Sequence, residues 1–176
     1  VLLQFFGGEA LIEAELVFAA MEYAMQRAKS LEKQIGFILS SNGWTLNADR
    51  VERLKAFPVK LELSLDGDAH TQNSQRRAFK KGADSYENSI ASNVAAILES
   101  GLEQEVIMVV HPQYASKLRE NFFHIADLGF RRIQINFALG FVWSEQQKKD
   151  FANALFQIGE TLKQRWVDGD DLVFVN

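Results

Sequence analysis

Small, acidic and hydroxyl side chains stand at the ends of apolar segments, where a parallel α/β sheet places its chemistry. The first such segment, Leu2–Phe6, is followed by Gly7, Gly8 and Glu9. Adjacent glycines let the backbone approach a ligand closely because they carry no Cβ. A carboxylate accepts charge-assisted hydrogen bonds from an ammonium group. Taken alone, this pattern is more often an ordinary turn between a strand and a helix.

Two further segments end in residues of similar chemistry. The second segment is followed by Ser41 and Asn42, and the third ends in Ser64 and Asp66. Ser64 and Asp66 are alternate residues, so in a strand they point to the same side. Such a pair suits a ribose diol, as an acidic residue does in dinucleotide sites. Each motif alone also fits a turn or a cap, but their order at successive strand ends favours a small polar ligand.

Strand-like segments alternate with helical patterns along the whole chain, which is typical of βα units around a parallel sheet. We expect strands at 2–6, 34–39, 59–65, 106–110, 132–137 and 172–175. We expect helices at 9–30, after Asn47, before Gly101, before Gly129 and after Ser144, with a polar, basic loop at 68–84. The fold class is therefore α/β, in a single domain over residues 1–176. Periodicity leaves barrel-like and doubly wound arrangements open.

Apolar periodicity also predicts which helix faces are buried. The stripe of the first helix comprises Ile12, Leu16, Ala19 and Tyr23. The stripe of the last helix comprises Phe151, Leu155, Ile158 and Leu162. The first strand is expected to be buried, and because Val1 already lies in it, we expect further residues upstream.

Composition excludes several classes of protein and site. The formal net charge of −4 argues against a broad nucleic-acid surface. No apolar segment reaches the length that spans a bilayer and no signal sequence opens the chain, so a cytoplasmic location is the default expectation. The chain has no cysteine, which excludes disulfides and thiolate-held metals within it. Its histidines, His70, His111 and His124, lack helical spacing to one another, so no metal ligands are assigned.

The motifs at the strand ends resemble those of the radical S-adenosylmethionine (radical SAM) family. Phe6-Gly7-Gly8-Glu9-Ala10-Leu11 resembles its F-G-G-E-P-L, Ser41-Asn42-Gly43-Trp44-Thr45-Leu46 its T-N-G-T-L-L, and Leu63-Ser64-Leu65-Asp66-Gly67 its S-x-D-G. Leu128-Gly129-Phe130-Arg131-Arg132-Ile133 is similar to the lead into its penultimate strand. The similarity covers nearly the whole chain and is greatest to the branch that modifies peptides and proteins, including anaerobic sulfatase-maturating and SPASM-containing enzymes.

This resemblance implies a parallel, partial TIM-like barrel, with about five βα units of a (β/α)6 barrel. It implies S-adenosylmethionine as a cofactor and a peptide or protein as the substrate of the parent enzyme. In the family the glycines and the carboxylate meet the amino group of the methionine moiety, and S-x-D-G is associated with ribose and methionyl contacts. The cofactor-binding residues that it implies are Gly7, Gly8, Glu9, Ser41, Asn42, Ser64, Asp66 and Arg77, the last of these beside Arg76.

The departures from the family pattern limit what this chain does alone. The family's C-x-x-x-C-x-x-C, which holds a [4Fe-4S] cluster, has no counterpart here, nor does the first βα unit that carries it. We therefore expect the cluster ligands upstream, assign no catalytic residue and expect these residues alone to be inactive. Ala10, Thr71 and Ser74 replace a proline, an aspartate and an arginine of the family. An open strand edge at the missing unit would favour association.

Two other classes of function stay open. One is a cluster-less module that binds S-adenosylmethionine, a nucleotide or a peptide without radical chemistry. The other is an unrelated barrel enzyme for a phosphorylated substrate, which needs a glycine-rich loop after a late strand; 138–140 is a poor candidate. Phe137, Phe141 and Trp143 suit either a peptide-binding mouth or apolar closure of the barrel end.

Overall fold

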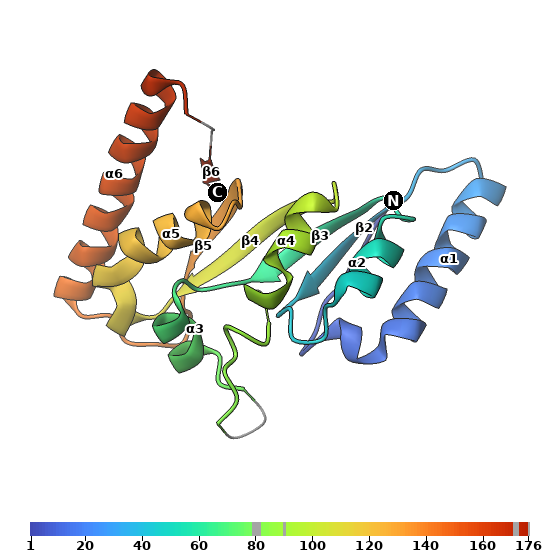
Figure 1. The fold of residues 1–176 in the computed structure, drawn as a ribbon, viewed down its shortest axis with the longest axis horizontal. Helices are drawn as coiled ribbons and strands as arrows, with labels where there is room; N and C mark the ends of the chain where they lie inside the picture. The colour runs from blue at the N-terminus through green and yellow to red at the C-terminus, as the bar shows by residue number, and fades with distance from the viewer. Residues whose placement is uncertain (79–81, 90, 171–172, 176) are drawn as a thin grey trace. The chain divides into compact units, whose positions relative to one another are not determined.

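The computed structural model describes residues 1–78, 82–89, 91–170 and 173–175. The chain divides into two compact units, of which the first is Val1–Ser64 with Glu87–Glu105 and the second is Leu65–Tyr86 with Val106–Asn176. Each unit combines parallel strands with helices (Figure 1). The α/β class predicted from the sequence is confirmed.

The first unit is built on three parallel strands. They are β1 (Leu2–Phe5), β2 (Gly36–Ser41) and β3 (Val59–Ser64), close to the predicted ranges. Leu3 pairs with Phe37, which pairs in turn with Val59. Alternation along these strands buries Phe37, Leu39, Leu61 and Leu63 on one face of the sheet.

Helices cover that buried face. The helical segments of this unit are η1 (Ala10–Glu13), α1 (Ala14–Ser30), α2 (Ala48–Leu54), η2 (Ala91–Asn93) and α4 (Val94–Glu99). The rings of Phe18 and Phe37 both contact that of Phe57, which follows α2. Helices α1 and α2 lie side by side (Figure 1) and are joined by the ion pair of Glu15 with Arg53. Asn47 caps α2, as predicted.

The predicted inner face of the first helix is wrong. Ile12, Leu16 and Tyr23 are 68%, 68% and 65% exposed, and Ala19 is exposed as well. The buried residues are instead Leu11, Ala14, Val17, Phe18 and Met21. The helix opens with a 3₁₀ turn, whose period of three residues places Leu11 and Ala14 on the same side. Both stripes are apolar, so periodicity alone could not choose between them.

The expectation that the first strand is buried is also wrong for the described residues. Val1, Leu2 and Leu3 are 77%, 63% and 40% exposed. Among the described strands β1 pairs only with β2, so its other edge carries backbone groups without a strand partner there.

The second unit holds the remaining elements. Its strands are β4 (Glu103–Val110), which begins in the first unit, β5 (Arg132–Phe137) and β6 (Phe174–Val175). Its helices are α3 (Ala69–Gln75), η3 (Pro112–Lys117), α5 (Leu118–Asp127) and α6 (Glu145–Asp168). The predicted loop at 68–84 therefore contains a helix, α3, because Asp68 caps it. Leu172 of the predicted last strand, and Ile90 of an earlier predicted helix, lie outside the described residues.

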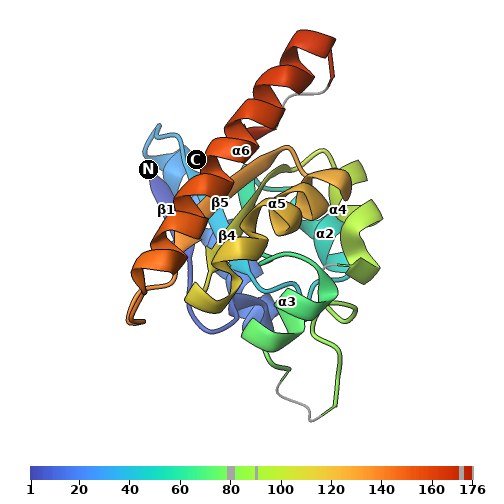
Figure 2. The same ribbon diagram turned by 90° about the vertical axis from the view of Figure 1, so that its left-hand side faces the viewer.

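The core of the second unit forms around α5. Leu118, Phe122 and Ile125 are completely buried, and Gly129 beyond them has a φ of 111°, as expected of a residue that ends a helix. Helix α6 lies beside α5 and is the long, continuous helix of Figure 2. Its predicted stripe is only partly right, since Ile158 is buried whereas Leu155 is 38% exposed.

Both ends of α6 are fixed by local sequence. Ser144 and Gln147 form a reciprocal capping box at its start, and Gly169 ends it with a φ of 83°. Within the part of the chain that the structure describes, no helix has both the length and the apolar character of a membrane-spanning segment.

Candidate functional site

The carboxylate of Glu9 connects the carboxyl ends of β1 and β2. The Ser41 hydroxyl donates to Glu9 Oε1 at 2.9 Å, and the Asn42 backbone N–H donates to Glu9 Oε2 at 2.7 Å. The N–H of Leu11 donates to Oε1 at 3.1 Å, so Glu9 also caps the turn that opens α1. The structure thus brings together three of the residues predicted from the sequence: Glu9, Ser41 and Asn42.

The Glu9 carboxylate retains capacity for a further donor. An ionised carboxylate offers about four acceptor positions, and these three bonds leave one on Oε2. Gly7 has a φ of 156°, a conformation that favours glycine, and apart from the adjacent residues no described atom lies within 4 Å of a Cβ built at Gly7 or at Gly8. The two glycines therefore leave open space in the loop next to an acceptor suited to an ammonium group.

The loop after β2 is shaped by its own polar side chains. Ser41 Oγ accepts from the N–H of Gly43 at 3.0 Å, and Asn42 Oδ1 accepts from the N–H of Trp44 at 2.8 Å. The Thr45 hydroxyl is buried and has no hydrogen-bond partner among the described residues. A buried polar group in this condition marks a place where a ligand or water would complete the bonding.

Ser64 and Asp66 fall in different units. Ser64 ends β3 in the first unit, on the sheet face opposite the buried Leu61 and Leu63. Asp66 belongs to the second unit, and its contacts are with residues of that unit. Their joint contact with a ribose therefore stays a prediction.

Asp66 is buried, with 2% of its surface exposed. Arg76 Nε and Nη2 donate to its two carboxylate oxygens at 2.8 and 3.0 Å. The N–H of Val109 donates to Oδ1 at 2.9 Å. The partner of Asp66 is thus Arg76, whereas Arg77 is exposed, and its predicted role stays a prediction. Such a bidentate pair fixes the position of the chain after β3.

Two buried amide side chains complete this turn. Gln72 Oε1 accepts from the N–H of Asp66 at 2.8 Å, and Asn121 Oδ1 accepts from the N–H of Asp68 at 3.1 Å. A Cβ built at Gly67 would lie 2.2 Å from Asn121 Cγ, and Gly67 has a φ of 144°, so the position requires glycine. Sequence reasoning missed both amides, because a single glutamine or asparagine in a helix carries no distinguishing pattern.

The pKa of Asp68, which caps α3, is shifted by its surroundings. Burial by itself raises the pKa of Asp68, but hydrogen bonds from the Thr71 backbone and hydroxyl lower it, with help from His124 and His70. The lowering causes prevail, so the pKa of Asp68 lies below its ordinary value. The charged carboxylate is therefore favoured as the cap of α3.

The chain does not fit an iron–sulfur cluster by itself. It has no cysteine, and within the described ranges no group of three or more His, Asp or Glu side chains is arranged to hold a metal ion. His124 Nε2 bonds to the Tyr86 hydroxyl at 2.7 Å, and the His111 ring lies 4.5 Å from that of Phe141. We therefore derive no reaction step through a cluster.

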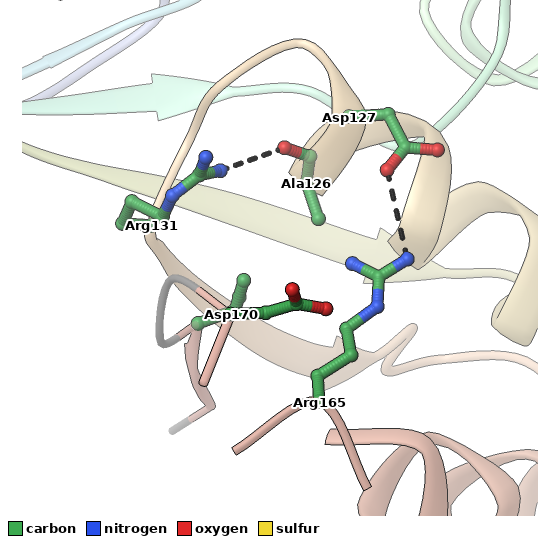
Figure 3. A pocket seen from close by; sticks show the side chains of 6 residues that line it. Ala126, Asp127, Arg131, Arg165 and Asp170 are labelled. Atoms are coloured by element: carbon green, nitrogen blue, oxygen red, sulfur yellow. Dashed lines mark hydrogen bonds and ion pairs between the residues drawn. The ribbon is translucent and has the colours of Figure 1, made fainter. Parts of the chain in front are cut away.

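A polar pocket of about 330 Å³ in the second unit is shown in Figure 3. Arg131 donates to the carbonyl oxygen of Ala126 at 2.9 Å, and Arg165 Nη2 lies 3.8 Å from Asp127 Oδ1. None of the residues predicted for cofactor binding lines it. Its two arginines already interact with the protein, so this pocket is not the candidate site.

An apolar pocket of about 270 Å³ is lined by Phe137, Trp143, Lys148 and Phe151. Phe137 and the nearby Phe141 are 55% and 53% exposed. The described residues therefore do not bury these aromatic rings, as apolar closure of a barrel end would require.

The fold built by these elements is the α/β partial-barrel fold of radical SAM enzymes, as comparison with solved structures shows. The structure of the anaerobic sulfatase-maturating enzyme anSMEcpe with bound AdoMet matches with a TM-score of 0.85 and 16% identity, over 99% of this chain and 49% of that one. The same enzyme with AdoMet and the Kp18Cys peptide matches with a TM-score of 0.84 and 16% identity, over 99% and 49% of the two chains.

Streptococcus suis SuiB bound to its precursor peptide SuiA matches with a TM-score of 0.63 and 16% identity, over 99% of this chain and 37% of that one. The chain thus spans about half the length of anSMEcpe. No protein-family model matches it. No curated protein sequence matches it. At this identity the likeness establishes the fold, and the partial barrel that the motifs implied is confirmed.

Proposed function

We propose that these residues form the S-adenosylmethionine-binding part of a radical SAM enzyme that modifies a peptide or protein. The observation that carries this proposal is the fold match over 99% of the chain to an enzyme solved with bound AdoMet. Peptide complexes of anSMEcpe and of SuiB support a peptide as the substrate class. The proposal places the ligands of a [4Fe-4S] cluster outside these residues.

Within this proposal Glu9 binds the ammonium group of the methionine moiety. Its remaining acceptor position on Oε2 and the open space beside Gly7 and Gly8 support this role. Ser41 and Asn42 orient the carboxylate, and the unpartnered Thr45 hydroxyl lies in the same loop. When bound, S-adenosylmethionine supplies the 5′-deoxyadenosyl group with which such enzymes begin radical chemistry.

Asp66 acts differently from the other predicted cofactor residues. Both of its oxygens are engaged by Arg76 and one also by Val109. We propose that Asp66 and Arg76 hold the turn at Gly67 in place and that Ser64 makes the more direct contact with the cofactor. Arg77 is kept as a secondary candidate for cofactor contact because its side chain is exposed.

A cluster-less binding module is the second candidate. Both candidates predict S-adenosylmethionine binding, whereas only the enzyme predicts that the full-length protein binds iron and cleaves the cofactor.

Equilibrium dialysis of S-adenosylmethionine with the full-length protein tests the cofactor binding that both candidates predict. Glu9→Gln is expected to weaken binding about tenfold, because it removes a charge-assisted hydrogen bond. Glu13→Gln is the matched control, since Glu13 is exposed and makes no capping bond in α1. Absence of saturable binding in the wild type, or equal affinities of wild type and Glu9→Gln, would contradict the proposal.

A further inference from the structure

The first unit carries a polar row on the sheet face that its helices leave uncovered. On β3, Leu61 and Leu63 are buried against the helices, so Lys60 and Glu62 point to the opposite face. A parallel sheet with helices on both faces has apolar residues on both. The polar residues therefore indicate that this face meets something other than an apolar core.

The Glu62 carboxylate is oriented by side chains of two neighbouring strands. Ser40 on β2 donates to Glu62 Oε2 at 2.8 Å, and the two residues are paired in register. Gln4 Nε2 on β1 donates to the same oxygen at 3.4 Å and lies 3.4 Å from Ser40 Oγ. Three strands thus fix one carboxylate whose side chain is only 16% exposed.

The charge of Glu62 is only partly compensated within the described residues. Lys60 Nζ forms an ion pair with Glu62 Oε1 at 4.0 Å, beyond hydrogen-bond distance, and the same ammonium group bonds more closely to the Glu105 carboxylate. No described residue donates a hydrogen bond to Oε1, and both donors to Oε2 are neutral. A largely buried carboxylate whose hydrogen-bond donors are all neutral would be stabilised by a charge-assisted hydrogen bond from a cationic group. An anionic ligand would be repelled by it.

We propose that Glu62 is a substrate-binding residue that accepts a charge-assisted hydrogen bond from an ammonium or guanidinium group. That the cation belongs to a peptide rests on the function proposed above. Ser64 lies two residues further along the same face of β3, about 7 Å away. The cation would therefore be held next to one of the predicted cofactor residues, and Glu62 would select peptides with a basic side chain or a free amine there.

Saturation-transfer NMR with the full-length protein tests the site through two probes of nearly equal shape. N-acetylarginine amide carries the cation, and N-acetylcitrulline amide replaces it with a neutral urea group. Saturable transfer is expected for the arginine probe, with an affinity about tenfold weaker in Glu62→Gln. Glu52→Gln is the control, because Glu52 is exposed and paired with Lys55 in the same unit. Equal transfer to both probes, or no change in Glu62→Gln, would overturn the proposal.

A second variant keeps the carboxylate and removes its orienting donor. Ser40→Ala is expected to weaken the arginine probe about threefold, and unchanged binding would contradict the orienting role. Dialysis of S-adenosylmethionine on the same samples separates the two proposals. If the arginine probe binds in a way that depends on Glu62 but S-adenosylmethionine does not bind, only the proposed function is refuted. If S-adenosylmethionine binds but the arginine probe shows no Glu62-dependent binding, only this inference is refuted.

Discussion

The carboxylate of Asp66 is buried and bonded by three donors, and the charge that balances it comes from Arg76. A buried charge that loses its partner is strongly destabilising, because the remaining ion is neither hydrated nor compensated. The sequence identifies the aspartate through its S-x-D-G context. It cannot identify the partner, because Arg76 and Arg77 are adjacent and only the end of α3 decides which one faces inward.

Replacement of Arg76 tests how much its ion pair with Asp66 contributes to stability. Arg76→Ala is expected to lower the free energy of unfolding by about 3 kcal/mol, since it leaves the Asp66 charge unpaired. Arg77→Ala, at the exposed neighbouring position, is expected to change it by less than about 0.5 kcal/mol. Urea denaturation followed by circular dichroism measures both. Equal midpoints for the two variants would show that the ion pair contributes nothing to stability.

Helix α3 depends on its cap, because seven residues form too few intrahelical bonds to be stable alone. Asp68→Ala is expected to cost about 1 kcal/mol of unfolding free energy at pH 7. Asp68→Asn keeps the capping oxygen and is expected to cost a few tenths of a kcal/mol.

The pH dependence of this cap follows from the sign of the shift. The pKa of Asp68 is lower in the folded state than its ordinary value of 3.8. Its stabilisation is therefore present above that value and is lost as the pH falls through the lower, folded-state pKa. The gap between wild type and Asp68→Ala should shrink below about pH 4. Thermal melts from pH 7 to pH 3 check this, and a gap that stays constant would contradict a titrating cap.

At the scale of elements, the sequence predicts strands better than helix faces. β5 (Arg132–Phe137) matches its predicted range, because its apolar residues alternate within clear turn signals. In the first helix the 3₁₀ turn at 10–13 changes which apolar stripe is buried, and this turn depends on the capping bond from Glu9. Helix α3 was missed because its residues are polar and its cap resembles a loop.

At the scale of the whole molecule, the motifs predict the partial-barrel fold, and they bring together Glu9, Ser41 and Asn42. The roles of Asn121 and Glu62 could not be predicted, because each arises from a contact between residues distant in sequence. The bond from the Asp66 N–H to Gln72 is local, but a single glutamine in a short helix carries no pattern that predicts it. The exposure of the apolar residues in β1 and in the outer stripe of α1 also could not be predicted, because a local apolar pattern does not encode which of its faces is buried.

The most direct test of the central claim is cofactor cleavage by the full-length protein. The protein would be reconstituted with iron and sulfide without oxygen, reduced, and given S-adenosylmethionine, with 5′-deoxyadenosine measured by chromatography. A radical SAM enzyme is expected to bind iron through a C-x-x-x-C-x-x-C upstream of Val1 and to release 5′-deoxyadenosine, with much less released by Glu9→Gln. A full-length protein that binds S-adenosylmethionine but takes up no iron and releases no 5′-deoxyadenosine would contradict the proposed enzyme and favour the cluster-less binding module.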